Sequence, residues 1–286
     1  MKRQKSFIDE KPTLYLVATP IGNLAELTPR AVDILKQVDV IAAEDTRNTR
    51  KLLSHFDIHT KLIAHHQYNE NESAEGLLQL LADGNDVALV SDAGYPLISD
   101  PGQYVSRMVI DAGYSVVPIS GANAMLNALV ASGLPTQPFL FYGFLKPKDT
   151  LQKQELEKLK DYPQTLIFYE APHRIKKTLQ NMRQVLGDRQ ICLARELTKR
   201  YEEFIRGTIS ELLDIIDTCK GEMVIVVKGA EENTAPDSDP NELYHKINEY
   251  MQNGFSSNEA IKKVAKESGC SKNELYRKFH EQQSMR

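Results

Sequence analysis

Short apolar runs alternate with helix-length amphipathic segments from residue 13 onward, and this alternation constrains the fold more than any other feature. Each run is followed by enough chain for a helix, which is typical of parallel strands joined by helical crossovers. The sequence therefore predicts an α/β fold with a largely parallel sheet. Its first five expected strands are 14–18, 38–43, 61–65, 86–91 and 114–119.

Two of the expected helices begin with the same signature. Thr28 and Asp100 can each cap a helix, and a proline follows both of them at the first helical position. The first helix is expected to run to about Gln37, and the second to end before Gly113. A third helix is expected over about 121–131.

A break in periodicity divides the chain. The segment 131–139 contains Gly133, Pro135 and Pro138, and a new strand pattern follows at once. We therefore predict an N-terminal α/β domain over 1–132 and a second α/β domain over 133–230. The second domain is expected to have a helix starting at Pro172 and strands near 139–144, 165–169, 190–195, 201–206 and 222–228.

The last part of the chain differs in composition. Residues 231–240 are polar and acidic and predict a linker, and 241–286 predict a helical module. Two capping boxes, Ser256 with Glu259 and Ser271 with Glu274, have helix-turn-helix spacing. Residues 261–280 carry six basic and two acidic side chains, which is consistent either with nucleic-acid contact or with a docking module.

Composition excludes several classes of protein. The 286 residues have a net charge of −4, so the chain is no general polycation, and any contact with RNA must use a local patch. The three cysteines never form a C-x-x-C pair, which favours a reducing compartment over a disulfide framework or a zinc site. The N-terminus lacks the apolar centre of a signal peptide, and no run is long enough to span a bilayer. We expect a cytoplasmic protein without a metal.

Three small-residue loops follow expected strands. They are ATPIGN at 18–23, SDAGYPLISDPG at 91–102 and SGANA at 120–124. The carboxyl ends of parallel strands form the usual ligand crevice of an α/β sheet. Neither a P-loop nor the G-x-G-x-x-G fingerprint occurs. The loop at 18–23 alone is also what a plain turn would give. We expect a ligand at the loop 91–102, where Asp92 is a carboxylate able to bind it and a structural turn is the alternative, and 120–124 would line the same crevice.

Three clusters mix carboxylates with basic groups. They are EDTRNTRK at 44–51, YEAPHR at 169–174 and RELTKRYEEFIR at 195–206. Such clusters either bind phosphates or form surface ion pairs, and the pattern leaves both open. No nucleophile signature occurs, and Cys192 lies inside an apolar run, so covalent catalysis is disfavoured.

Six motifs occur in order along the chain: LYLVATPIGNLAELTPRA, EDTRNTRKLL, SDAGYPLISDPG, FYEAPHR, RELTKRYEEFIRG and KGEMVIVV. Together they resemble the tetrapyrrole methylase superfamily, and within it the enzymes that methylate ribosomal RNA. The resemblance covers about 12–230 and implies a homodimer whose subunits have two α/β domains with a cofactor cleft between them. It also implies transfer of a methyl group from S-adenosylmethionine to the ribose 2′-hydroxyl of a cytidine in the decoding region of 16S rRNA, as naked RNA or in the small ribosomal subunit.

The resemblance assigns cofactor contacts, the expected reaction suggests catalytic candidates, and the position of basic groups beside the cleft suggests contacts to RNA. Glu170 and Lys199 are our candidates for assisting loss of the hydroxyl proton. The expected contacts to RNA are Arg47, Lys51, His173, Arg174 and Arg195. The expected cofactor contacts are Ile21, Gly22, Asp92, Tyr95, Gly121, Ala122, Asn123, Tyr169, Glu222 and Met223.

Two other functions remain open. The same fold and cofactor could serve a small tetrapyrrole-like acceptor, because members of a superfamily share a cleft and diverge in what enters it. Alternatively, the chain could be a non-catalytic regulator that binds nucleic acid through its C-terminal module. The three charged clusters favour the RNA enzyme.

Overall fold

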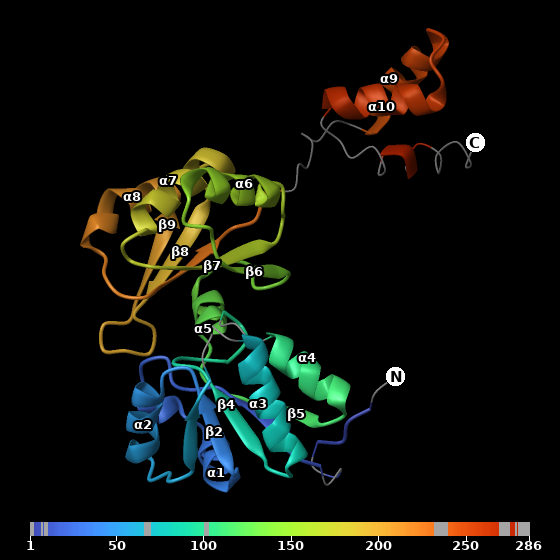
Figure 1. Cartoon of the computed structure of the whole chain (residues 1–286). Coiled ribbons are helices and arrows are strands. Elements are labelled where there is room, and N and C mark those ends of the chain that lie inside the picture. The colour runs from blue at the N-terminus through green and yellow to red at the C-terminus, as the bar shows by residue number, and fades with distance from the viewer. Residues whose placement is uncertain are drawn as a thin grey trace. The chain divides into compact units, whose positions relative to one another are not determined.

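The computed structural model describes residues 3–6, 8, 11–65, 70–99, 103–231, 240–268, 275–277 and 279. The chain divides into two compact units (Figure 1), Met1–Gly229, called the body here, and Ala230–Arg286, called the tail. The caps expected at Asp100 and Ser271 and most of the expected linker lie outside the described residues. Within the described part, no helix is long and apolar enough to cross a membrane.

The first sheet of the body is entirely parallel, as the sequence predicts. Its strand order is β3-β2-β4-β1-β5, and every neighbouring pair is parallel. The apolar runs of β2 and β4 become strands whose side chains are buried on both faces of the sheet. The strands are β1 (Thr13–Val17), β2 (Val40–Ala43), β3 (Lys61–Ala64), β4 (Val87–Val90) and β5 (Ser115–Ile119).

Helices cover both faces of this sheet. On one face, α1 (Pro29–Gln37) and α2 (Thr46–His55) bury Leu35 and Leu53 against β2 and β4. On the other face, α3 (Glu70–Ala82) and α4 (Gln103–Ala112) bury Leu77 and Val109. Thr28 caps α1 as expected, since its Oγ1 accepts the Ala31 N–H at 3.2 Å. A 3-10 turn, η1 (Leu24–Glu26), precedes this cap.

The second sheet is mixed, and here the expectation of a largely parallel sheet is wrong. Its order is β6-β7-β10-β8-β9; β6 pairs with β7 in parallel, and the other three pairs are antiparallel. The link between β8 and β9 is too short for a crossover helix, so these strands form a hairpin. The strands are β6 (Phe139–Phe144), β7 (Thr165–Glu170), β8 (Gln190–Arg195), β9 (Glu203–Thr208) and β10 (Met223–Val227).

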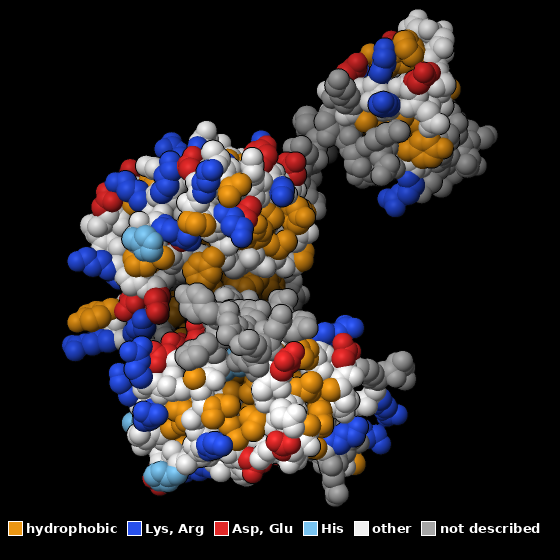
Figure 2. Space-filling view, in the orientation of Figure 1, with side chains coloured by type: hydrophobic (Ala, Val, Ile, Leu, Met, Phe, Trp, Pro, Cys, Tyr) orange, Lys and Arg blue, Asp and Glu red, His pale blue; other side chains and the backbone are white. Residues whose placement is uncertain are grey.

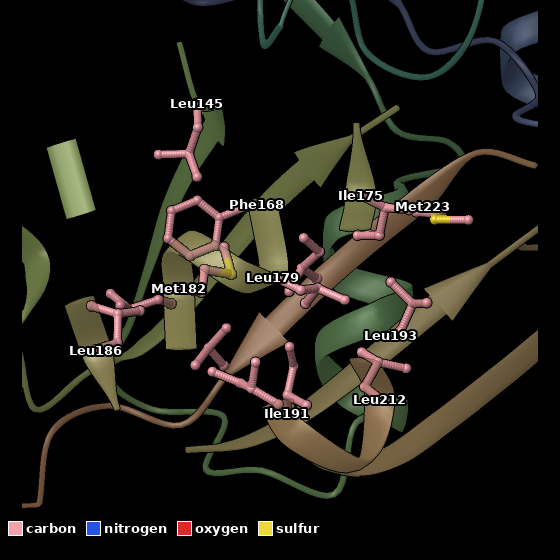
Figure 3. Packing of buried hydrophobic residues seen from close by; sticks show 14 of the residues in the cluster. Leu145, Phe168, Ile175, Leu179, Met182, Leu186, Ile191, Leu193, Leu212 and Met223 are labelled. Carbon is pink, nitrogen blue, oxygen red and sulfur yellow. The ribbon is translucent and has the colours of Figure 1, made fainter. Parts of the chain in front are cut away.

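One face of the second sheet carries three helices, α6 (Asp149–Leu159), α7 (Ile175–Leu186) and α8 (Ile209–Ile215), and a 3-10 turn, η3 (Ile216–Thr218), follows α8. Figure 3 shows the apolar core beneath them, in which Phe168 and Leu193 of the sheet meet Leu179 and Met182 of α7.

The opposite face is covered by α5 (Ala124–Ala131), whose Ala128 and Leu129 pack with Ile167, Cys192 and Val226. The boundary predicted at 132/133 therefore lies between α5 and the sheet that α5 covers. Asn123 caps α5 through its Oδ1, which accepts the Leu126 N–H at 3.0 Å, so the helix starts at Ala124 rather than at 121.

The tail has an apolar core of its own. Its helices α9 (Pro240–Gln252) and α10 (Ser257–Ser268) bury Ile247, Ile261 and Val264 against one another. At the start of α10, the Glu259 carboxylate accepts the backbone N–H and the hydroxyl of Ser256, at 3.0 and 2.6 Å. The predicted helical module is therefore present in the described part of the tail.

Candidate active site at the carboxyl ends of the strands

Two of the predicted ligand loops are joined directly. Thr19, after β1, and Gly94, after β4, exchange two backbone hydrogen bonds, at 2.9 and 3.0 Å. Thr19 Oγ1 also donates to the Ser91 carbonyl at 3.1 Å, and Ser91 Oγ to the Gly94 carbonyl at 3.1 Å. Gly94 has φ +78°, a conformation that glycine adopts without strain. The loops after β1 and β4 thus form one rigid wall.

The third loop packs against the end of β1. A Cβ on Gly121 would lie 2.9 Å from Ala18 Cβ and 3.1 Å from the Ala18 carbonyl oxygen, so only glycine allows this close approach. The loop then ends at Asn123, the cap of α5. All three predicted loops therefore meet at the carboxyl ends of neighbouring strands.

These loops and the second sheet enclose a cavity of about 350 Å³, a size typical of small-ligand sites. The first half of the body contributes the loops after β1 and β4 and the start of α5. The second half contributes the ends of β6 and β7, the loop after β8 and the start of β10. The lining residues are Ile21, Ala93, Gly94, Tyr95, Ile98, Ser99, Asn123, Ala124, Phe144, Tyr169, Glu170, Ala171, Pro172, Leu197, Glu222, Met223 and Val224.

Most of the expected cofactor contacts line this cavity, and four do not. Gly22 and Asp92 instead line a neighbouring recess of about 260 Å³, together with Asn48 and Lys51. Gly121 and Ala122 are not among the lining residues. The expected contacts that do line the cavity are Ile21, Tyr95, Asn123, Tyr169, Glu222 and Met223.

Lys199 lies where the two halves of the body meet. Its Nζ is 2.9 Å from Glu222 Oε2 and 3.1 Å from Glu196 Oε1. Its aliphatic chain lies on Gly22, where an added Cβ would be only 2.5 Å from Lys199 Cγ. Partial burial lowers the pKa of Lys199, but the hydrogen bonds to Glu222 and Glu196 outweigh it, and the pKa is above its usual value. The side chain is therefore a cation near neutral pH.

Glu170 is buried and fully engaged. Its Oε1 accepts the Ala171 N–H at 2.8 Å and two bonds from the Arg174 guanidinium, at 2.8 and 2.6 Å. Its Oε2 accepts the Thr178 hydroxyl at 2.5 Å. These contacts favour a role in orienting Arg174 over a role as a proton acceptor, because the same lone pairs would have to take the proton.

The five side chains expected to contact RNA differ in whether they already form ion pairs or hydrogen bonds within the protein. Arg47 is exposed and binds Asp45 at 2.9 Å; hydrogen bonds from its side chain and backbone N–H lower the pKa of Asp45 to about 2. Arg195 binds Glu203 and the Lys220 carbonyl. Lys51 lines the recess that contains Asp92, and His173 and Arg174 line a third recess. Figure 2 shows lysine and arginine side chains gathered over α6, α7 and α8 on one face of the body.

Phe144 and Leu197 line the cavity and were missed by the sequence analysis. Phe144 ends β6, and its place at the carboxyl end of an expected strand is a signal that could have found it. Leu197 lies inside the RELTKR cluster, where no sequence pattern distinguishes it from its charged neighbours. Among the described residues, no three His, Cys, Asp or Glu side chains are grouped to hold a metal ion. Cys192 is buried, and burial raises the pKa of its thiol.

Comparisons with known proteins agree with this architecture. Residues 13–213 match the family model described as Tetrapyrrole (Corrin/Porphyrin) Methylases. Two solved structures share the fold. The methyltransferase CobJ has a TM-score of 0.58 and 19% identity, and the match covers 77% of this chain and 95% of CobJ. Diphthine synthase has a TM-score of 0.59 and 14% identity, and the match covers 76% of this chain and 90% of that protein.

Curated relatives match nearly the whole chain. Proteins named "Ribosomal RNA small subunit methyltransferase I" are 48% identical in Halalkalibacterium halodurans, over 99% of this chain and 100% of the relative, and 48% identical in Bacillus subtilis, over 98% and 99%. The relative of the same name in Synechocystis is 44% identical over 92% and 95%. The chain therefore belongs to the tetrapyrrole methylase family and, within it, groups with the relatives named ribosomal RNA small subunit methyltransferase I.

Proposed function

We propose that this protein transfers a methyl group from S-adenosylmethionine to the ribose 2′-hydroxyl of a cytidine in the decoding region of 16S rRNA. The observation that carries the proposal is the cavity of about 350 Å³ formed by the predicted loops, in a chain 48% identical over nearly its full length to ribosomal RNA methyltransferases. The resemblance found in the motifs supplies the acceptor atom and nucleotide.

The residues present fit S-adenosylmethionine. An apolar wall of Ile21, Leu197 and Met223 suits the face of an adenine, and the Glu222 carboxylate suits the positive charge of a sulfonium. A Cβ on Gly94 would stand 3.5 Å from Ile21 Cγ2 and 3.8 Å from the Ala122 carbonyl, so the missing side chain leaves room along the wall. The cofactor, when bound, would supply a methyl group on a sulfonium sulfur; an acceptor oxygen can attack that methyl group, and neutral S-adenosylhomocysteine leaves as the C–S bond breaks.

Lys199 would then stabilise the negative charge that develops on the acceptor oxygen. Its ammonium is held by Glu196 and Glu222 beside the cavity and is charged near neutral pH. A fixed cation of this kind lowers the barrier without accepting the hydroxyl proton, which would pass to solvent water as the O–C bond forms. Glu170 would contribute by orienting Arg174, and Arg47, Lys51 and His173 would hold the RNA backbone. The proposed reaction requires no metal ion. The proposal also retains the expected homodimer.

The test is methyl transfer from radiolabelled S-adenosylmethionine to small ribosomal subunits lacking the modification, with naked 16S rRNA beside them. Alkaline digestion leaves an uncleaved dinucleotide wherever a 2′-oxygen is methylated. A labelled, alkali-resistant cytidine dinucleotide is the expected product. Cofactor binding without transfer to either RNA would refute the proposal and favour a small acceptor or a regulator. Light scattering on the intact protein tests the homodimer.

A further inference from the structure

A third recess in the body adjoins the cavity and has a different character. It is formed by the segment after β6, Leu145–Pro147, and the segment after β7, Ala171–Arg174, except Pro172. Phe144 and Ala171 line both the recess and the cavity. A group bound in the recess would therefore be the immediate neighbour of a group reacting in the cavity.

The recess is built to attract an anion. Lys146, His173 and Arg174 line it, and its described lining includes no Asp or Glu. Lys146 and His173 are exposed, and neither side chain has a partner among the described residues. Arg174 is also the N-cap of α7 and makes no side-chain cap bond, so the positive end of this 12-residue helix lies at the recess.

Arg174 is fixed in place by the interior of the domain. Its Nε and Nη2 bind Glu170, and Nη2 also lies 3.4 Å from the Leu145 carbonyl. The Glu170 carboxylate is held in turn by Thr178. Within the described part of the chain, these bonds leave Arg174 Nη1 as a donor without a partner. A pre-oriented guanidinium of this kind suits a phosphate oxygen.

Phe144 adds an aromatic surface between the recess and the cavity. The residue is 52% exposed. Its ring meets that of Tyr169 edge to face, with the centroids 5.6 Å apart. A ring that is exposed on one side and braced on the other can stack on a base, and single-stranded RNA is commonly bound by such rings beside basic groups.

We propose that this recess binds the nucleotide next to the acceptor in a single-stranded segment of RNA, with its base on Phe144 and its phosphate on Lys146, His173 and Arg174. An acidic peptide could bind the basic groups, but its carboxylates would not stack on the exposed Phe144 ring as a base would. The inference rests on the proposed function and adds a subsite to it.

The phosphate part is tested by the salt dependence of kcat/KM for methyl transfer to small ribosomal subunits. Lys146→Ala should lower kcat/KM at moderate salt and make the slope of log kcat/KM against log salt shallower by about 0.7, the value for one phosphate contact on a single strand. Lys158→Ala is the control, because Lys158 is an exposed lysine of the same domain that lies outside the recess. Equal slopes for the two variants would overturn the phosphate contact.

The stacking part is tested by Phe144→Leu and Phe144→Tyr. Loss of the ring should raise KM for subunits about 5- to 150-fold, while tyrosine should restore it, and the KM for S-adenosylmethionine should stay within about twofold in both. A raised KM for the cofactor alone would show that the Phe144 ring contacts the cofactor rather than a base of the RNA, and would overturn the stacking. If the unaltered protein methylates small ribosomal subunits and all variants behave like the controls, this inference is wrong and the proposed function stands. If the unaltered protein does not methylate small ribosomal subunits, the proposed function itself is wrong.

Discussion

Gly22 shows how a single missing side chain positions a charged group. Its φ is +154°, and an added Cβ would lie 2.5 Å from Lys199 Cγ and 3.0 Å from Thr198 Oγ1. The lysine therefore lies directly on the glycine, and the loop after β1 fixes the ammonium that the loop after β8 supplies. Both residues lie in motifs that the sequence singles out, but nothing in the sequence predicts that they touch, because a contact across 177 positions depends on the tertiary fold.

Replacing Gly22 by alanine should displace Lys199 and lower kcat by up to about a hundredfold, since a misplacement of about 1 Å can have that effect. Single-turnover methyl transfer to small subunits measures it. Gly84→Ala is the matched control, because Gly84 also has a positive φ of +93° but would bring its Cβ within 4 Å of nothing. A comparable loss of kcat in both variants would show that backbone strain, and not contact with Lys199, is responsible.

Lys199→Met should lower kcat about 10²- to 10³-fold with little change in cofactor affinity, because it removes a fixed cation. Lys199→Arg should retain part of the rate. The pKa of Lys199 is above its usual value, so the ammonium persists until pH rises beyond the ordinary lysine range. We therefore expect no rise of kcat from pH 6 to 9 that depends on Lys199. A limb in the profile that disappears in the methionine variant would identify Lys199 as a base instead.

Buried polar groups join three elements of the second domain. Gln152 of α6 and Thr178 and Asn181 of α7 are buried and bonded to one another or to Glu170 at the end of β7. Gln152 Nε2 donates to Thr178 Oγ1 at 3.1 Å, and Asn181 Nδ2 to Gln152 Oε1 at 2.6 Å. These hydrogen bonds connect α6 and α7 to Glu170, which in turn binds Arg174. A change in the packing of α6 against α7 should therefore also change the orientation of Arg174.

Thr178→Val should lower the free energy of unfolding by about 1–3 kcal/mol, because it removes a donor from a buried carboxylate while keeping the shape. Urea denaturation of the intact protein measures it. Thr178→Ser keeps the hydroxyl and should lose clearly less. An unchanged stability in Thr178→Val together with a loss in Thr178→Ser would mean that the methyl group, and not the hydrogen bond to Glu170, stabilises the domain.

The start of α6 is tied to α7 by Asp149, and this contact predicts a dependence on pH. Hydrogen bonds from Lys177, Asn181 and Lys153 lower the pKa of Asp149 to about 2. Its stabilising contribution is therefore present above the ordinary carboxyl pKa and is lost as pH falls towards about 2. In urea titrations, Asp149→Asn should be less stable than the unaltered chain at pH 6, and the difference should shrink by pH 2.5. A constant difference would contradict this assignment.

The sequence predicted elements better than their arrangement. The start of α1 was predicted from Thr28 and Pro29, and the first five strands from their apolar runs. Helix capping and burial depend on residues close together in the sequence, so both can be recognised without the tertiary fold. Periodicity carries no strand direction, so the antiparallel pairs of β10 were not predicted. At the site, the loops were found from their small residues, but Gly22 and Asp92 proved to line a neighbouring recess. The helix expected from Pro172 starts at Ile175, which makes Arg174 its N-cap, and the bond from Arg174 to Glu170 was not predicted.

At the scale of the whole molecule, the tail is a separate unit with its own core. Of its predicted basic patch, Lys263 is partly engaged, because its Nζ lies 3.9 Å from the centre of the Phe255 ring. Lys262 is exposed, and the side chains of Lys266, Lys272 and Lys278 lie outside the described residues. A tail of this kind can add affinity for RNA without contributing to the cavity.

Deleting 237–286 should leave the affinity for S-adenosylmethionine unchanged and weaken binding to small ribosomal subunits, because every described lining residue of the cavity lies in the body. Calorimetry with the cofactor and filter binding with subunits measure the two affinities. Loss of cofactor binding by a folded, truncated chain would contradict the prediction, and unchanged binding to subunits would remove the tail from RNA recognition.

The packing of α5 also determines how the body could bend. Because α5 covers the second sheet, while the loop before it packs on Ala18 of the first, the two sheets can separate as rigid bodies only by rotation at Gly121, Ala122 and Asn123. Asn123 is itself part of the cavity wall. The pivot and the binding site therefore share residues, and a ligand that immobilises Asn123 would also stiffen the joint between the two halves.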